Sequence, residues 1–409
     1  MNRSLLRSKS FLGFLGLYFL FNVSVNLLHP VTTVYVRELN LDSFYFGIFF
    51  SAMALGQVLG ALLWGFLSDK KGRKPFVLLG IFGYGLSQLG FGFLNPHPVF
   101  PVLFRFLSGF FACAPITLFI SSCLDQIDPA SRSDGLSLAS GVQLLGSAFG
   151  YEIGGTLYEY ASVSISHLFL IQASYCFLLV LLFAFLFHDK KRGGTPSISK
   201  KREEKIRWSF PLSLLLVATL FLTIGQININ KYMDPIVIDR GYGTASLGHY
   251  VFLTGIIGAI ANAFLLPFIR HWKINKTALL LISIAGSIVF VLLTYNIPGD
   301  LMVMLYSTHL LYILFRAFIT PLEQDLFAGF ANESTHGSIM GIRQSALSLG
   351  NVIGPLLGSA IYVAGSADIM NASSLFLSAA FLLFALFAWL RKKKQAKANI
   401  SQDEGDKGE

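Results

Sequence analysis

The sequence predicts an all-α membrane protein with twelve transmembrane helices in two pseudo-symmetric six-helix bundles. Hydrophobic residues make up 54% of the 409 residues and charged residues only 13%, against about 25% charged residues in soluble domains. The mean hydropathy of +0.63 agrees with this composition. The apolar residues form runs that reach the roughly 20 residues a spanning helix needs. Basic residues gather in short segments between alternate runs.

The N-terminal bundle is predicted over residues 1–187. Its apolar runs lie at 11–36, 44–67, 76–94, 98–121, 136–158 and 165–187. Arg3, Arg7 and Lys9 precede the first run, but that run is long and lacks a small-residue cleavage site. We therefore interpret it as the first spanning helix and not as a signal peptide.

A polar, basic loop at 188–209 divides the chain, and we expect it on the cytoplasmic side. The C-terminal bundle is predicted over 210–390. Its apolar runs lie at 211–235, 245–269, 277–296, 301–324, 338–362 and 368–390. The remaining residues, 391–409, begin with four basic side chains and continue with acidic ones, which predicts a solvated and disordered cytoplasmic tail.

The distribution of Lys and Arg predicts the orientation. With both termini inside, most of the 31 basic residues fall on the cytoplasmic side; Arg37, Lys231 and Arg240 fall outside, and Arg105 and Arg316 fall within spans. This is the positive-inside pattern. It predicts a multi-pass protein of the plasma or inner membrane with both termini cytoplasmic. It also explains the net charge of +9 without a nucleic-acid partner.

Glycines recur at four-residue intervals in the fifth and eleventh runs, which supports two related bundles. The repeats are Gly146, Gly150, Gly154 and Gly350, Gly354-Pro355, Gly358. Glycines at this spacing form a smooth stripe along one helix face. Such stripes let a second helix approach closely in lipid, so these residues are predicted to pack helices together. Related halves are typical of secondary transporters.

Five charges are compressed between the second and third runs, in the segment from Gly65 to Lys74. Its Gly65, Asp69, Gly72 and Arg73 have the spacing of the loop between the second and third helices of the major facilitator superfamily, which this chain resembles along its whole length. The resemblance implies transport by alternating access. It also implies that Asp69 contacts the start of the eleventh helix, near Gly337 to Gly341, and latches the outward-open state through the dipole of that helix.

Two charged residues within spans are candidates for proton coupling. Arg105, followed four residues later by glycine, resembles the fourth-helix motif of the drug:proton antiporters in this superfamily, although a snorkelling arginine is the alternative. Glu152 lies midway along the fifth run, where a desolvated carboxylate could exchange protons near neutral pH or simply bond across helices. The chain departs from the antiporter pattern at Tyr151, where proline is usual; Gly354-Pro355 occurs in the eleventh run instead.

Polar side chains concentrate in the first, seventh and tenth runs. In the resembling fold these helices and the fourth line a central cavity, so the side chains are candidates for substrate binding. They are Asn22, Asn26, His29, Gln226, Asn228, Asn230, His309 and Arg316. Each could instead hold helices together. Glu323 and Asp325, near the cytoplasmic end of the tenth run, could pair with Arg316 or Arg343.

The sequence favours a transporter over an enzyme. We find no HExxH, GxSxG or Walker A motif. The three cysteines lack metal-binding spacing. We therefore expect no cofactor or metal, only a proton gradient as the energy source. The function predicted is proton-coupled export of a drug-like or amphipathic metabolite by a monomer in the lipid bilayer. The alternatives are proton-coupled uptake of a sugar or organic anion and, more remotely, a membrane-embedded enzyme.

Overall fold

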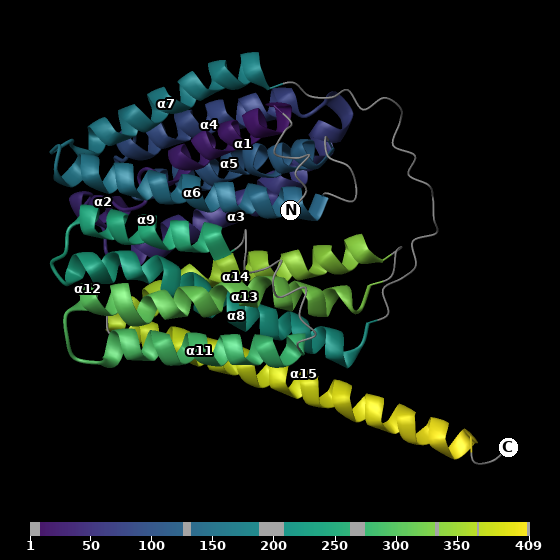
Figure 1. The fold of residues 1–409 in the computed structure, drawn as a ribbon. Helices are drawn as coiled ribbons and strands as arrows, with labels where there is room; N and C mark the ends of the chain where they lie inside the picture. The colour runs from purple at the N-terminus through teal and green to yellow at the C-terminus, as the bar shows by residue number, and fades with distance from the viewer. Residues whose placement is uncertain are drawn as a thin grey trace.

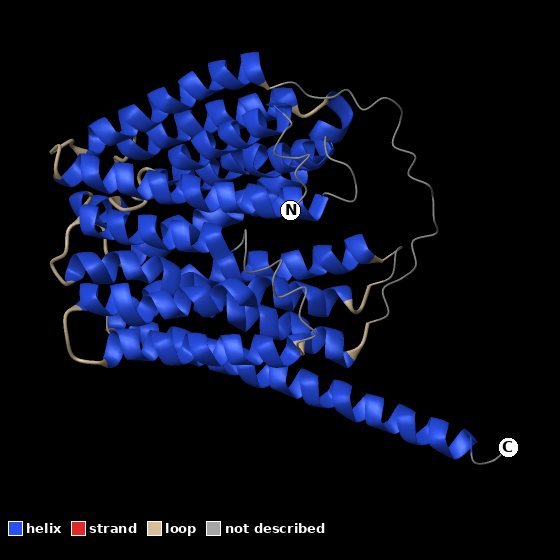
Figure 2. Ribbon diagram, viewed as in Figure 1, coloured by secondary structure: helices blue, strands red, loops and turns tan. Residues whose placement is uncertain are grey.

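The computed structural model describes residues 9–125, 132–187, 208–261, 275–331, 335–365 and 368–406, and all regular structure in these residues is helical (Figure 2). The first half of the chain forms α1 (Lys9–Asn26), α2 (Thr32–Glu38), α3 (Phe44–Lys71), α4 (Lys74–Phe93), α5 (Val99–Asp125), α6 (Arg132–Glu159) and α7 (Ile165–Leu186). The second half forms α8 (Phe210–Asp239), α9 (Thr244–Ile260), α11 (Lys276–Asn296), α12 (Leu301–Met304), η4 (Leu305–His309), α13 (Leu310–Ala328), α14 (His336–Ala364) and α15 (Asp368–Asp406).

The two halves of the chain form two helical layers, with α1 to α7 on one side and α8 to α15 on the other (Figure 1). We name the two ends of the assembly by residues. The Arg37 end carries the connections α2–α3, α6–α7, α8–α9 and α11–α12. The Lys71 end carries the connection α3–α4 and the beginnings of α8 and α14. One buried apolar cluster lies within the first half, and a larger one joins parts of both halves.

The helices have the lengths and composition of a multi-pass membrane protein. Among the described residues, nine helices are long and apolar enough to cross a membrane, and 11–26 and 244–260 are shorter apolar helices. The predicted fifth span corresponds to α6, which has 28 residues but a lower mean hydropathy because of its polar and glycine-rich sequence. The predicted eighth span is described only as far as residue 261, and the central loop lies outside the described residues except for Trp208 and Ser209.

Two predicted spans are interrupted. The first was expected to be continuous over 11–36, but α1 ends at Asn26 and α2 begins at Thr32. Pro30 lacks a backbone N–H and disfavours helical geometry at His29, which explains the break. The tenth contains a π-helical segment, η4, before α13. Single π turns are frequent at functional sites.

Two polar segments, predicted as a turn and as a disordered tail, are largely helical. The segment from Gly65 to Lys71 forms the end of α3, and only Gly72 and Arg73 separate it from α4. Gly72 ends α3 with a φ of +85°, a conformation that favours glycine. The tail predicted to be disordered continues α15 as far as Asp406. Its Lys, Gln and Ala residues extend a helix readily because no new nucleus is needed.

The two glycine stripes lie against equivalent neighbours. A Cβ added at Gly146, Gly150 or Gly154 of α6 would lie 2.7, 2.6 or 1.7 Å from a backbone oxygen of the first-span segment. A Cβ added at Gly350, Gly354 or Gly358 of α14 would lie 2.7, 2.4 or 2.3 Å from side chains of α8. Each stripe therefore brings a fifth helix of its half close to the first helix of the same half.

Candidate functional site between the two halves

The halves are in contact at the Arg37 end. The backbone N–H of Gly47 in α3 donates to Ser359 Oγ in α14 at 2.9 Å, and a Cβ at Gly47 would lie 2.1 Å from Pro355 O. Tyr232 of α8 donates to Pro355 O at 2.7 Å. Pro355, predicted to pack helices, thus offers its carbonyl oxygen at the seam between the halves.

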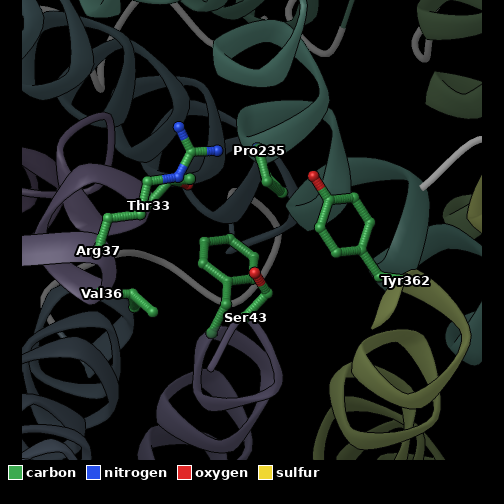
Figure 3. A pocket seen from close by; sticks show the side chains of 7 residues that line it. Thr33, Val36, Arg37, Ser43, Pro235 and Tyr362 are labelled. Atoms are coloured by element: carbon green, nitrogen blue, oxygen red, sulfur yellow. The ribbon is translucent and has the colours of Figure 1, made fainter. Parts of the chain in front are cut away.

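A polar network closes the same end near the solvent. Asp239 of α8 accepts hydrogen bonds from Arg37 of α2 and from Tyr362 of α14. Arg37 and Tyr362 also line a small pocket, together with Thr33, Val36, Ser43, Phe46 and Pro235. They approach it from opposite sides (Figure 3). The pocket contains about 260 Å³ of empty space, part of it open to solvent.

The second seam runs between α6 and α9. Glu159 Oε2 accepts from the backbone N–H of Ala245 at 2.8 Å, and Thr244 Oγ1 donates to Gly155 O at 3.1 Å. Closer to the middle, Glu152 pairs with His249 Nδ1 at 2.7 Å. The Glu152 side chain is 26% exposed. The predicted proton-coupling carboxylate therefore lies in a contact between the halves.

A buried charged group occupies the centre of the assembly. Asp234 of α8 is fully buried, and its Oδ2 accepts from Tyr151 of α6 at 3.1 Å. One helical turn earlier, Lys231 Nζ lies 3.4 Å from His29 Nδ1 and 4.2 Å from the centre of the Phe50 ring. Lys231 was predicted within the seventh run, toward its outer end. The chain continues as α8 for two further turns, and the side chain points inward between the halves.

Asp234 is one of the polar residues of the seventh run, but it was not among the residues predicted for the cavity. The sequence signal for Asp234 is its helical spacing from Lys231, which places both side chains on one face of the helix. At that face the second half provides a carboxylate and an ammonium group, and the first half provides Tyr151 and His29.

Arg105 of α5 is 2% exposed and stacks on aromatic rings. Its Cζ lies 4.7 Å from the ring centre of Phe91 and 5.6 Å from that of Phe50. Its Nε has no hydrogen-bond partner among the described residues. The Phe50 ring therefore contacts both Arg105 and Lys231, one from each half of the chain. The structure does not bring Glu152 into this group; Glu152 is bonded to His249.

The remaining predicted cavity residues, which lie in α8, η4 and α13, fall into three environments. Arg316 Nη1 donates to Asn230 Oδ1 at 2.7 Å. Asn228 is fully buried, with both polar side-chain atoms unpartnered among the described residues, and Gln226 Nε2 is also unpartnered there. His309 bonds to Tyr250 through Nδ1 and packs on Tyr295 and Tyr312, inside the second half.

The asparagines of the first span serve local contacts. Asn22 Nδ2 donates to Tyr18 O at 2.8 Å, one turn earlier in α1. Asn26 Nδ2 donates to Asn22 O at 2.9 Å and to Ser147 Oγ of α6 at 3.0 Å. Of the first-span candidates, His29 is the one placed in the central charged group.

The residues predicted to form a latch lie at the Lys71 end. Asp69 is in the last turn of α3, and Gly72 and Arg73 follow it. A Cβ at Gly65, Gly337 or Gly341 would meet nothing within 4 Å. These three glycines therefore have open space where a side chain would begin, and the contact of Asp69 with the start of α14 stays a prediction.

The two acids expected near that end form ion pairs. Glu323 accepts from Arg343 Nε at 2.7 Å and from Thr219 Oγ1 at 2.7 Å, all three residues being buried in the second half. Asp325 accepts from Lys276 at 2.7 Å. Arg343, one of the two partners considered for these acids, is thus the partner of Glu323. Arg316 binds Asn230 instead.

These features define a helical membrane carrier with a polar centre between two halves. A family model described as "Major Facilitator Superfamily" matches residues 14–315. The chain belongs to the major facilitator superfamily, and it is a transporter and not an enzyme. In the described residues no group of three or more His, Cys, Asp or Glu side chains could hold a metal ion.

Two curated relatives and one solved structure illustrate the similarity. The chain is 24% identical over 352 residues to the quinolone resistance protein NorA of Staphylococcus aureus (strain MSSA476), covering 84% of this chain and 87% of that protein. It is 25% identical over 357 residues to the multi-drug resistance efflux pump PmrA of Streptococcus pneumoniae (serotype 4), covering 84% and 86%. The fold matches a bacterial homologue of the human lysosomal transporter Spinster, in an inward-facing and unoccupied conformation, with a TM-score of 0.74, 15% identity and coverage of 93% and 96%.

Proposed function

We propose that this chain exports an amphipathic compound in exchange for protons, using a proton gradient as its energy source. The observation that carries the proposal is the buried carboxylate of Asp234, which lies between the halves within bonding distance of Tyr151 and one turn from Lys231. A carboxylate that both halves contact can couple its charge to their relative position. The efflux activity named for the relative PmrA supports the direction of transport.

Proton exchange follows from competition at one carboxylate. A cargo with a cationic group and a proton would each neutralise Asp234, so binding of one opposes binding of the other. By linkage this opposition is reciprocal. The positive charge of Lys231, one helical turn from Asp234 in α8, biases the balance. Glu152 with His249 remains the second candidate for the proton-binding carboxylate.

A second function, proton-coupled uptake of an organic anion, is favoured by a specific observation. Three other cationic side chains among the described residues form ion pairs with acids, namely Arg37, Lys276 and Arg343. The interior cations Arg105, Lys231 and Arg316 instead contact rings, a histidine or an amide. Interior cations whose described contacts are not with an acid attract anions. An anion bound near Asp234 would favour its protonation, so cargo and proton would move together.

The sign of proton movement on binding separates the two functions. The purified protein is mixed in weakly buffered detergent solution with rhodamine 123, a cationic xanthene dye, or with fluorescein, an anionic one. Proton release on binding the cation supports exchange, and proton uptake on binding the anion supports joint transport. Flux of the bound dye is then measured in proteoliposomes with an imposed pH gradient.

Variants of the carboxylates identify the proton-binding group. Asp234→Asn is expected to abolish the proton signal while leaving a folded protein. Asp42→Asn is the matched control, because Asp42 is an exposed acid whose carboxylate accepts from Phe44 N within its own half. Loss of the proton signal in Glu152→Gln but not in Asp234→Asn would identify Glu152 as the proton-binding carboxylate. A rate of dye flux that is the same with and without the pH gradient would refute proton coupling.

A further inference from the structure

We propose that Glu159 is a conformational latch, whose carboxylate binds the N-terminus of α9 across the two halves and stabilises the state closed at the Arg37 end. Glu159 is the last residue of α6, and α9 begins at Thr244 in the other half. Its Oε2 accepts from Ala245 N at 2.8 Å and from Thr244 Oγ1 at 3.4 Å. This role requires neither the proposed cargo nor proton coupling.

The N-terminus of α9 is built to receive an acid from outside the helix. The first backbone N–H groups of any helix lack partners within the helix and attract negative charge. A Ser, Thr, Asp or Asn residue usually supplies the capping oxygen. Here the capping position is Gly243, which has no side chain to do so. A Cβ on that glycine would lie 2.0 Å from Glu159 Oε2. Because Gly243 has no side chain, the first backbone N–H groups of α9 stay available, and the Glu159 carboxylate has room to reach them.

The contact of Glu159 with α9 depends on close packing of the two halves. Four residues before Glu159, Gly155 lies so close to α9 that a Cβ on it would be 2.3 Å from Thr244 O. Thr244 Oγ1 also donates to Gly155 O at 3.1 Å. Separation of α6 from α9 at this end would remove these bonds together, and the start of α9 would lose its cap. The cap of α9 therefore exists only in the closed state.

The contact between Glu159 and α9 is an acid bound at a helix N-terminus, which is the interaction predicted for the segment from Gly65 to Lys74 at the opposite end. There Asp69, in the last turn of α3, was predicted to approach the start of α14. In chain order α3 and α6 are the second and fifth predicted spans, and α9 and α14 are the eighth and eleventh. An inverted repeat relates α3 to α6 and α14 to α9, and it exchanges the two ends of the molecule. Glu159 on α9 is thus the inverted counterpart of Asp69 on α14, and each acid would hold one of the two states.

The test measures the population of the closed state without cargo. Spin labels are placed at Ala161 and Ile297, exposed residues of opposite halves at the Arg37 end, after the three native cysteines are replaced by alanine. Distance distributions are recorded by double electron–electron resonance. Glu159→Gln is expected to raise the ratio of long-distance to short-distance populations about two- to fivefold, the size of an exposed charge–helix interaction. Glu159→Ala, which also loses the acceptor, should shift it further.

Asp42→Asn is the matched control. Asp42 is an exposed acid at the same end that caps α3 within its own half, through Phe44 N at 2.7 Å. Its loss should leave the distance distribution unchanged. Thermal unfolding of each variant shows whether the protein remains folded. Equal distributions for Glu159→Ala, Asp42→Asn and the parent protein would overturn the proposal, and so would a shift of equal size in both variants.

Discussion

At the scale of single residues, the charged side chains in the membrane-spanning region fall into two groups. Glu323 and Arg343 form a buried ion pair within the second half, and Thr219 also donates to the carboxylate. Asp234, Lys231 and Arg105 meet between the halves, where Asp234 Oδ1 and Arg105 Nε have no partner among the described residues. An ion pair within one half can stabilise the fold, whereas charges at a moving interface between the halves can respond to a ligand or a proton.

The structural assignment of Glu323 and Arg343 predicts a large effect of removing one partner. Arg343→Met leaves a buried carboxylate unpaired and is expected to cost about 3–5 kcal/mol of stability. The double variant Glu323→Leu, Arg343→Met removes both charges and should recover most of that loss. Thermal unfolding in detergent measures both. Equal destabilisation by the single and double variants would contradict a structural pair.

At the scale of helices, close packing depends on the glycine stripes. The glycines of α6 lie against backbone atoms of the first span, so a larger residue has no flexible neighbour to displace. The equivalent glycines of α14 face side chains of α8, which can adjust more easily. The α6 stripe is therefore expected to tolerate larger residues less well than the α14 stripe, although the two sequences are similar.

Gly154→Ala is expected to destabilise the protein, by about 1–3 kcal/mol as for other overpacked sites. Its Cβ would lie 1.7 Å from Leu27 O. Gly16→Ala in α1 is the control, because a Cβ there meets nothing within 4 Å. Alanine also favours helix more than glycine does, so this control should be neutral or stabilising. Thermal unfolding that ranks the two variants in the reverse order would refute the packing argument.

At the scale of the whole molecule, the described contacts between the halves gather toward the Arg37 end. Gly47 with Ser359, Glu159 with Ala245 and Arg37 with Asp239 all join the halves there. The glycines at the Lys71 end have open space. Transport by alternating access requires these contacts to break and the opposite end to close. With the predicted cytoplasmic termini, this state would face inward.

Cross-linking the two halves at the Arg37 end is therefore expected to stop transport. Arg37→Cys with Asp239→Cys, in the background without native cysteines, is treated with a short bifunctional methanethiosulfonate, which forms a reducible disulfide with each cysteine and releases methanesulfinate. Dye flux in proteoliposomes should fall to background and return on reduction. The control pair, Tyr242→Cys with Asp300→Cys, joins two bonded residues of the same half and should leave flux unchanged. Undiminished flux in the cross-linked Arg37–Asp239 protein would contradict the required opening.

The sequence by itself determined the membrane class, the superfamily, the alternation of apolar runs and the glycine stripes. These features depend on local composition and spacing, because hydropathy and helical periodicity act within one segment. Even there, Pro30 broke the first span and the charged end of α3 stayed helical, since helix continuation depends on single residues.

Only the tertiary structure decided which charges meet. Asp234 and Tyr151, Lys231 and His29, and Glu159 and Ala245 are far apart in the chain and come from opposite halves. No spacing along one helix specifies such pairs, because they depend on how the two bundles approach each other. The same reason placed Glu152 beside His249 and left Arg105 among aromatic rings. The central site and the Glu159 latch are therefore properties of the assembled halves.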